Sequence, residues 1–359
     1  MCIVDRKFSL PPIASTGFAA MVCLDGISNG YLLNYLMSPD FDTYANRTDN
    51  SKGVAYPAIN DKHLYAALVP VPPLAEQRRI AERVSELMPL VGEYGKLEDE
   101  REALDASLPE RLRKSVLQMA VEGKLVPQDP SEEPASVLLD RIREERAHLI
   151  KEKKIKAPKG GESVIYLGSD GRRYEKRGKG EPVCIDDEIP FEIPEGWEWA
   201  RLEGITTYIQ RGKSPKYSLE KKYPVVAQKC NQWSGFSLER AKFVDPNSVA
   251  SYAEERLLVD GDLLWNSTGL GTLGRMAVYD SNQNPYGWAV ADSHVTVIRT
   301  APDWLRYEYA FLYFAGPSVQ SVIEDQASGS TKQKELAQET VKRYPVSYTH
   351  LRAHETLAN

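Results

Sequence analysis

The sequence predicts an α+β protein in which globular mixed α/β domains are joined by long coiled-coil helices. Two features indicate this fold class: an apolar stripe with heptad spacing within residues 74–123, and short apolar runs separated by Gly, Pro, Asn and Ser from residue 185 onwards. A weak internal repeat indicates, in addition, that the two ends of the chain contain related domains. The 359 residues, 42% hydrophobic and 27% charged, are enough for about two domains.

The repeat relates the beginning of the chain to its end. Residues 31–39 (YLLNYLMSP) align with residues 309–317 (YAFLYFAGP). After a one-residue gap, three apolar positions of each copy follow in the same order: Ile59, Leu64 and Val69 in the first, and Leu336, Val341 and Val346 in the second. We therefore expect residues 1–69 to be the C-terminal part of a domain of which residues 185–346 are a more complete copy.

The region between the two copies, residues 70–155, is predicted to be helical. Five of its apolar residues are spaced by 4, 3, 4 and 3 positions, as in a helix packed against another helix: Ile80, Val84, Leu87, Val91 and Tyr94. Further seam positions follow a capping box at 107–110, and they are Leu112, Val116 and Met119. The pattern leaves open whether residues 74–123 form one kinked helix or two.

A third helix is predicted over residues 134–154, followed by a flexible linker. The apolar side of this helix consists of Val137, Leu138, Ile142 and Leu149. Residues 156–184 are rich in Lys, Arg and Gly, a composition typical of a basic linker.

Residues 185–346 predict a mixed α+β domain. Strands are expected over residues 202–209, 224–227, 262–266, 275–279 and 289–298, with a helix over 305–314. The last segment, 347–359, resembles translated cloning or adapter sequence. We expect it to be a non-native tail, so that His350 and His354 have no chemical role.

Composition excludes several classes of protein. No apolar run approaches the ~18 residues of a membrane-spanning helix, and the N-terminal stretch is too polar for a signal peptide, so we expect a soluble, cytoplasmic protein without a membrane partner. The four cysteines lie far apart, which predicts neither a disulfide framework nor a zinc site: Cys2, Cys23, Cys184 and Cys230. We expect no metal and no cofactor.

One pattern is shared with nucleotide-binding enzymes, the formal GxGxxG of Gly269, Gly271 and Gly274. A dinucleotide site needs a helix directly after the glycines, whereas residues 275–279 have the pattern of a strand, so we predict a glycine-rich turn between strands. The HExxH, GxSxG and Walker motifs are absent from the sequence. We therefore predict no catalytic residues and no enzymatic activity for this chain.

Nucleic-acid binding fits the residues better. Arg and Lys contact phosphates, whereas Asn, Gln and Arg bind base edges, so an interface needs both kinds on adjoining loops. Residues 208–233 have this mixture, although the net charge of −6 argues mildly against a purely electrostatic binder. The candidate DNA contacts in this stretch are Arg211, Lys213, Lys216, Tyr217, Lys229, Asn231, Gln232 and Trp233. His294, inside a predicted strand, is either a structural imidazole or a further DNA contact.

Four segments resemble the specificity subunit of type I restriction-modification systems. They are residues 71–80 (VPPLAEQRRI), 123–130 (GKLVPQDP) with 133–136 (EPAS), 193–199 (IPEGWEW) and 261–274 (GDLLWNSTGLGTLG). That family has two target-recognition domains, each followed by a conserved helical region. The resemblance implies that residues 1–69 end the first recognition domain, that 70–155 are the central helices, and that 185–346 are the second recognition domain. It also implies that most of the first domain and the distal helix lie outside this sequence.

By this resemblance, the chain recognises DNA and leaves the chemistry to other subunits. The implied partners are double-stranded DNA with a bipartite target, methyltransferase (modification) subunits, and nuclease (restriction) subunits. The methyltransferase would flip and methylate an adenine. The predicted DNA face then gains Ser267, Thr268, Arg275 and Lys332.

Three other functions stay open at this point. A helical scaffold whose domains bind protein predicts no salt-dependent DNA affinity. An enzyme that binds a nucleotide at residues 269–274 predicts thermal stabilisation by NAD or ATP. The specificity segment of a single-chain restriction-methylation enzyme requires catalytic motifs upstream of Met1.

Overall fold

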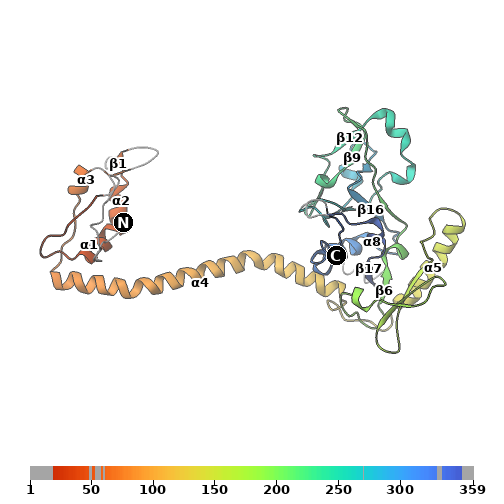
Figure 1. Ribbon diagram of the computed structural model, residues 1–359, viewed down its shortest axis with the longest axis horizontal. Helices are drawn as coiled ribbons and strands as arrows, with labels where there is room; N and C mark the ends of the chain where they lie inside the picture. Colours follow the sequence, from red (N-terminus) through yellow and green to blue (C-terminus); the bar gives the residue numbers. More distant parts are fainter. Residues whose placement is uncertain are drawn as a thin grey trace. The chain divides into compact units, whose positions relative to one another are not determined.

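The computed structural model of the chain (Figure 1) describes residues 19–47, 51–52, 58–59, 61–269, 271–329 and 334–349. The chain divides into two compact units, residues 1–108 and 109–359. The long helix α4 (Leu74–Val121) crosses this boundary and contributes residues to both units. The predicted fold class, α+β with a long helix, is confirmed.

In unit 1, short elements surround the start of α4. They are α1 (Asn29–Leu36), α2 (Pro39–Ala45), β1 (Ser51–Lys52), β2 (Ala58–Ile59) and α3 (Asp61–Tyr65). The buried amide of Gln77 fixes the first turn of α4. Its Oε1 accepts a hydrogen bond from the Ser28 N–H at 2.8 Å, and its Nε2 donates to the carbonyls of Gly26 at 3.0 Å and Pro72 at 2.8 Å.

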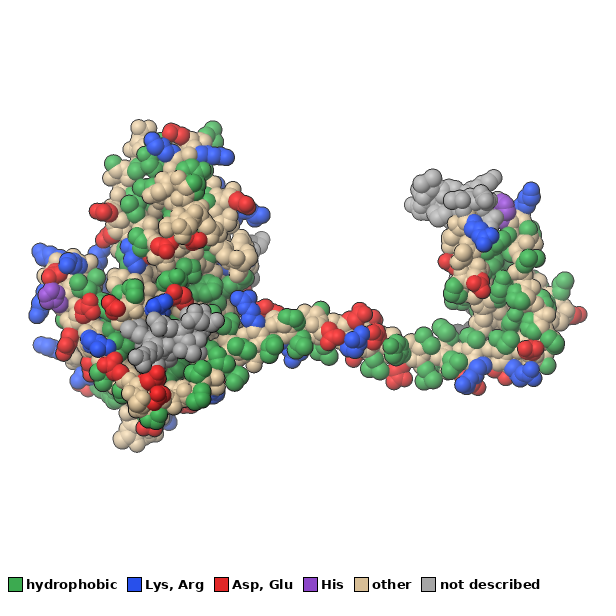
Figure 2. Space-filling model, turned by 180° about the vertical axis from the view of Figure 1, so that it is seen from behind, with side chains coloured by type: hydrophobic (Ala, Val, Ile, Leu, Met, Phe, Trp, Pro, Cys, Tyr) green, Lys and Arg blue, Asp and Glu red, His purple; other side chains and the backbone are tan. Residues whose placement is uncertain are grey.

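The 48 residues of α4 form one helix, which answers the question that the sequence left open. Ser107, the predicted cap of a second helix, instead donates its hydroxyl to the Leu104 carbonyl within α4. Along α4 the predicted seam residues are largely exposed, with Val91 at 58% and Tyr94 at 66%. Figure 2 shows hydrophobic side chains along the surface of the helix. Packing of this seam against another helix remains a prediction.

Helix α5 (Ala135–Lys151) is the predicted third helix and packs against the core of unit 2. Three of the four residues assigned to its apolar side contact the core, namely Leu138, Ile142 and Leu149. The fourth assignment, Val137, is wrong, since this side chain is 49% exposed. It lies beside the apolar stripe because neighbouring helical residues are rotated by about 100°.

Residues 156–184, predicted as a flexible linker, are folded. They contain an antiparallel sheet in the order β3-β4-β5, formed by β3 (Ser163–Leu167), β4 (Arg173–Arg177) and β5 (Val183–Cys184). The linker prediction is wrong because the glycines that suggested flexibility make turns: φ is 79° at Gly171 and 51° at Gly178. Ile165 and Ile185 join the sheet to the main hydrophobic core. We call β3–β5 the small sheet.

The predicted strands of residues 185–346 are mostly confirmed. Three of them are β9 (Pro224–Val226), β13 (Leu263–Asn266) and β14 (Met276–Val278). The segment 202–209 differs, because it begins as a 3₁₀ turn, η2 (Leu202–Gly204), and only then enters β7 (Tyr208–Arg211). The segment 289–298 is divided into β15 (Val290–Ala291) and β16 (Val295–Arg299) by a turn in which the Val295 N–H donates to the Asp292 carbonyl at 2.9 Å.

The other strands and helices of unit 2 are short. The strands are β6 (Glu198–Arg201), β8 (Tyr217–Ser218), β10 (Asn231–Gln232), β11 (Gly235–Phe236), β12 (Lys242–Val244) and β17 (Pro345–Tyr348). The α-helices are α6 (Tyr307–Ala315), α7 (Pro317–Gln320) and α8 (Gln338–Lys342). The 3₁₀ turns are η1 (Asp186–Glu188), η3 (Gln228–Cys230), η4 (Pro246–Ser251), η5 (Glu254–Arg256) and η6 (Ser281–Gln283).

Two four-stranded sheets organise these strands. One is antiparallel, in the order β14-β13-β16-β7, and the other, β15-β9-β12-β8, is mixed because β15 runs parallel to β9. A further pair joins β17 to β6, so that the ordered strand extends two residues beyond the domain end expected at Val346. Trp265 of β13 lies fully buried against Phe314 of α6, with ring centroids 4.7 Å apart.

The two copies of the internal repeat predicted from sequence contain matching hydrogen bonds. In each copy, two tyrosine hydroxyls one helical turn apart donate to backbone carbonyls two residues apart in the segment that leaves the domain. The pairs are Tyr31–Pro70 and Tyr35–Leu68 in the first copy, at 2.8 and 2.7 Å, and Tyr309–Ser347 and Tyr313–Pro345 in the second, at 2.7 and 2.7 Å. We call these the tyrosine–carbonyl pairs.

Candidate nucleic-acid interface

One end of the antiparallel sheet collects the candidate DNA-binding loops. β7 ends at Arg211, which pairs with Thr296 near the start of β16, and β13 ends at Asn266, opposite Val295. Because neighbouring strands run in opposite directions, the loop after β13, the turn before β16 and the start of β14 all lie at this end. We call it the sheet edge. Thr268, Arg275 and His294, which the sequence scatters over 27 residues, are brought together there.

Hydrogen bonds connect most of the side chains of the sheet edge. Thr268 Oγ1 lies 2.8 Å from His294 Nδ1 and accepts from Gln228 Nε2, also at 2.8 Å. Arg275 donates from NH1 to Gln232 Oε1 at 2.6 Å and from NH2 to the Gly271 carbonyl at 3.1 Å. These side chains are therefore oriented before any ligand binds.

Arg211 is held at the same edge by protein groups. Its Nε donates to the Ser293 carbonyl, and its NH1 forms an ion pair with Glu335. The side chain is 23% exposed. A phosphate that binds here must therefore compete with a carboxylate for the guanidinium.

Two predicted contacts, Asn231 and Ser267, are wrong as direct DNA ligands because both residues are fully buried. Asn231 Nδ2 donates to the Leu264 carbonyl at 3.2 Å and to Asn266 Oδ1 at 2.9 Å. The Ser267 hydroxyl lies 2.5 Å from the hydroxyl of Thr296. Both side chains support the sheet edge from within. Lys332 lies outside the described residues.

Exposed cations and aromatic rings surround the sheet edge. Lys213, Lys216, Lys229 and Trp233 are exposed, the last at 44%. The Lys213 ammonium lies 5.2 Å from the centre of the Tyr252 ring, a cation–π distance.

Tyr217 and Asp292 form a second ordered contact beside these cations. The Tyr217 hydroxyl donates to Asp292 Oδ2 at 2.8 Å. Burial and this hydrogen bond raise the pKa of Tyr217 to about 12, so the hydroxyl keeps its proton at neutral pH. The proton of this hydroxyl is directed at Asp292, so a phosphate that binds at Tyr217 must compete with a carboxylate for it.

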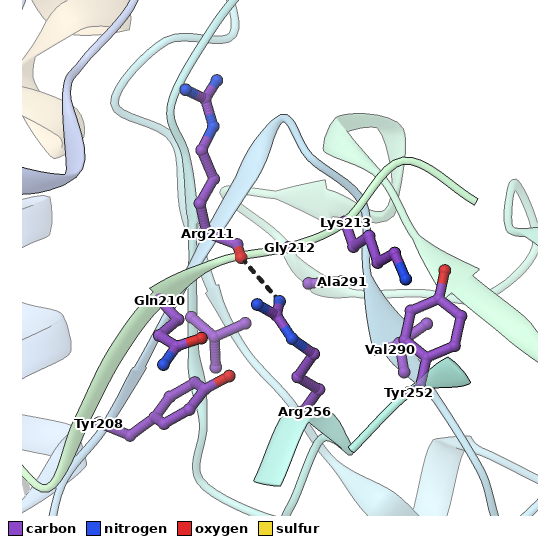
Figure 3. Close-up of a pocket in the computed structure, with 10 residues that line it drawn as sticks. Tyr208, Gln210, Arg211, Gly212, Lys213, Tyr252, Arg256, Val290 and Ala291 are labelled. Atoms are coloured by element: carbon purple, nitrogen blue, oxygen red, sulfur yellow. Dashed lines mark hydrogen bonds between the residues drawn. The ribbon is translucent and has the colours of Figure 1, made fainter. Parts of the chain in front are cut away.

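Neither hollow near the sheet edge has the form of a closed small-molecule site. The first lies between Tyr208, Gln210, Lys213, Tyr252 and Arg256 and has a volume of about 10 Å³, the size of one water (Figure 3). The Arg256 guanidinium is part of its lining and donates to the Arg211 carbonyl at 3.2 Å. The second is an open groove of about 470 Å³ whose lining includes Trp233, Arg275, Glu324 and Asp325.

The glycines of the GxGxxG pattern form the predicted turn between strands β13 and β14. Gly269, Gly271 and Gly274 have φ values of 105°, 68° and 80°, a region that side chains disfavour. A Cβ at Gly269 would also lie 2.9 Å from Gln228 Nε2. The glycines therefore shape the loop that carries Thr268 and Arg275.

The residues that the structure describes contain neither a candidate metal-binding cluster nor a candidate membrane-spanning helix. Within them, no group of three or more His, Cys, Asp and Glu side chains is placed to hold a metal ion. Among the helices of the same ranges, none combines the length and hydropathy of a membrane span.

Sequence reasoning missed Gln228, Ser293 and Glu335 as parts of the sheet edge. Gln228 lies in the mixed basic and amide segment, so composition pointed to its neighbourhood but could not single it out. Ser293 contributes a backbone carbonyl, and Glu335 is distant in sequence from the arginine that it binds. No local pattern signals such contacts.

These features define a protein of α+β units with a long, apolar-faced helix and a sheet edge built from hydrogen-bonding and cationic side chains. No family model matches the sequence. The chain is 28% identical over 251 residues to the type I restriction enzyme EcoAI specificity subunit of Escherichia coli, and 28% over 246 residues to the EcoEI specificity subunit of the same organism. It is thus a homologue of type I restriction enzyme specificity subunits over about two thirds of its length.

The aligned part is a limited share of these relatives. The two alignments cover 69% and 66% of this chain but 38% and 36% of the relatives. Among solved structures, the HsdS subunit from Thermoanaerobacter tengcongensis is 16% identical, with a TM-score of 0.41, over 93% of this chain and 61% of that one. A chain from a study of complex assembly and conformational transition of the type I R-M system is 16% identical, with a TM-score of 0.39, over 93% and 62%.

Proposed function

We propose that this chain is a sequence-specific DNA-recognition subunit of a type I restriction-modification complex, acting in the cytoplasm. It directs methyltransferase and nuclease subunits to a bipartite target and performs no catalysis itself. The observation that supports this most is the convergence of Arg275, Gln228, Gln232 and His294 at one sheet edge, bordered by exposed lysines. The similarity to the EcoAI and EcoEI specificity subunits supports the same function.

The proposed division of work follows from side-chain chemistry. Arginine and glutamine present paired hydrogen-bonding atoms that match guanine and adenine edges, so Arg275 and Gln232 are the proposed base contacts. Lysine is a flexible point charge and suits phosphates, so Lys213, Lys216 and Lys229 are the proposed backbone contacts. The bonds that already orient Arg275 reduce the entropy lost on binding.

The exposed seam of α4 is the proposed assembly surface of the protein. Large apolar side chains along this helix are 40–66% exposed from Leu87 to Tyr94. Contiguous apolar surface of this kind marks a protein-interaction site. We propose that a partner helix and the modification subunits cover it.

The test is selection of DNA from a random duplex library with this chain co-expressed with a modification subunit, washed at rising salt. We expect enrichment of a defined motif, and loss of one part of it on deletion of residues 185–346. Stable assembly with the modification subunit without an enriched motif would contradict DNA recognition.

The exposed α4 seam also favours a second candidate, a scaffold that binds only protein. A scaffold predicts that the affinity of the complex for DNA does not depend on the residues of the sheet edge. The same selection, repeated with Arg275→Ala, separates the two functions.

A further inference from the structure

The small sheet is rigidly joined to the rest of unit 2 by a buried ion network. The Glu175 carboxylate, 8% exposed, accepts from Arg201 NH2 at 2.7 Å, from the Ser163 hydroxyl at 2.6 Å and from Arg177 Nε at 2.7 Å. Arg177 NH1 continues the network to Glu203 at 3.1 Å. The sheet therefore has a fixed place in unit 2.

Strand alternation gives the small sheet an outer face. Glu175 and Ile165 point inward, so their neighbours Tyr174 and Tyr166 point outward. These two tyrosines are directly paired across β3 and β4, and their rings stack with centroids 6.1 Å apart and planes inclined by 26°. Lys176 lies exposed on the same face, opposite Val164.

Positive charge exceeds negative charge in residues 151–180, whereas exposed carboxylates flank β5, at Glu181, Asp186, Asp187 and Glu188. Between residues 151 and 180, two carboxylates are exposed, those of Glu152 and Asp170. The others, Glu162 and Glu175, form ion pairs with arginines. The exposed cations outnumber them: Lys151, Lys153, Lys154, Lys156, Lys159, Arg172, Lys176 and Lys179.

The loop of Lys159 adjoins the sheet edge through helix α8, whose Glu339 carboxylate pairs with Lys159. Lys159 Nζ lies 3.9 Å from Glu339 of α8, and the neighbouring Gln338 accepts from the Arg211 N–H at 3.3 Å. The turn that precedes Lys179 lies against the Lys159 loop, since a Cβ on Gly161 would be 2.8 Å from the Cα of Gly178.

We propose that the small sheet and its lysines form a second DNA-contact surface, which binds the phosphodiester backbone outside the bases contacted by the sheet edge. This inference rests on the proposed function. DNA is the occupant favoured by the structure because the surface has eight exposed cations and adjoins the sheet edge. Lysines bind phosphates without reading sequence, so the surface adds affinity and not specificity.

The test compares the wild-type complex with a variant carrying Lys159→Gln, Lys176→Gln and Lys179→Gln. The matched control carries Lys96→Gln, Lys114→Gln and Lys124→Gln, the same change of charge on other exposed lysines. DNA affinity is measured against salt for two duplexes that share the selected motif, one trimmed to the motif and one with long flanks.

We expect the first variant to lose about tenfold or more in affinity for the flanked duplex, with the slope of log affinity against log salt smaller by about 2–3. The trimmed duplex, the selected motif and the control variant are expected to stay unchanged. An unchanged salt slope with an intact motif would overturn this inference and leave the proposed function standing. Loss of the modification subunit from the first variant, at an unchanged salt slope, would identify an acidic protein partner and also overturn it.

A wild-type complex that selects no motif would overturn the proposed function instead. In that case, a reduced salt slope in the first variant alone would still support a DNA-contact surface on the small sheet. Equal slopes in both variants would refute it.

Discussion

Arg275 and Lys216 are expected to respond differently to removal of their side chains. Arg275→Ala deletes a guanidinium oriented by Gln232 and Gly271, and we expect preference at one base pair to fall by about 1–3 kcal/mol. Lys216→Ala removes a point charge, and we expect all sequences to weaken alike, with a salt slope smaller by about 1. Competition binding with single-base variants of the selected motif measures both effects.

A control for these two variants is Arg240→Ala, which removes an exposed arginine on another turn. It is expected to keep the wild-type preference. If Arg275→Ala kept the full preference as well, the sheet edge would not contact bases.

Asn231 belongs to the interior, and its replacement should act on stability. Asn231→Ala leaves the Leu264 carbonyl and the Asn266 side chain without their buried donor, which costs about 1–3 kcal/mol of folding free energy. Urea unfolding measures this loss. An unchanged unfolding midpoint together with a relaxed base preference would restore Asn231 to the interface.

The sequence indicated the right residue types for the candidate site but not their burial. Asn231 and Gln232 are adjacent, and only the second side chain reaches the sheet edge. In a two-residue strand, the two side chains point to opposite faces of the sheet. Composition does not show which of the two points inward. The pairing of Arg211 with Glu335 depends on tertiary structure and had no local signal.

Among the elements, the small sheet should be sensitive to acid. Although burial opposes it, the hydrogen bonds from Arg201 and Ser163 bring the pKa of Glu175 below its ordinary value. A carboxyl whose pKa is lowered by folding stabilises the protein above its unfolded pKa, and that stabilisation is lost as the pH falls through the folded pKa. We expect unfolding experiments to show this loss below about pH 4.3, the ordinary glutamate value.

Glu175→Gln provides the comparison for this acid sensitivity. It removes the titrating carboxyl group. We expect the unfolding free energy of the variant to be lower than that of the wild type at neutral pH, and the difference to shrink as the pH falls. A constant difference in unfolding free energy from pH 7 to pH 3 would mean that Glu175 does not titrate in this way.

The elements also differ in how far the sequence predicted them. Helices α4 and α5 have long periodic patterns, and strands such as β13 are continuous apolar runs, so their existence was predictable. The small sheet was not predicted because its inward positions include Glu175, a charged residue whose burial depends on Arg201. A hydrophobicity pattern does not register a strand whose inner face is ionic.

At the scale of the whole molecule, the seam of α4 is expected to control assembly and not folding. Val91→Gln and Tyr94→Gln replace exposed apolar side chains, so the chain should keep its unfolding midpoint but lose the co-purifying modification subunit. Glu93→Gln on the same helix is the control and should retain it. Retention of the subunit by the seam variant would place assembly elsewhere.

The repeat of the tyrosine–carbonyl pairs has a consequence for how such chains diverge. Each pair joins a side chain to a main-chain oxygen, an atom that every amino acid supplies. The departing segment is therefore free to change its residues, as Leu68 and Pro345 illustrate, while the two phenols stay in place. Duplicated halves can thus drift apart in amino-acid identity until little but the tyrosine spacing marks their common ancestry.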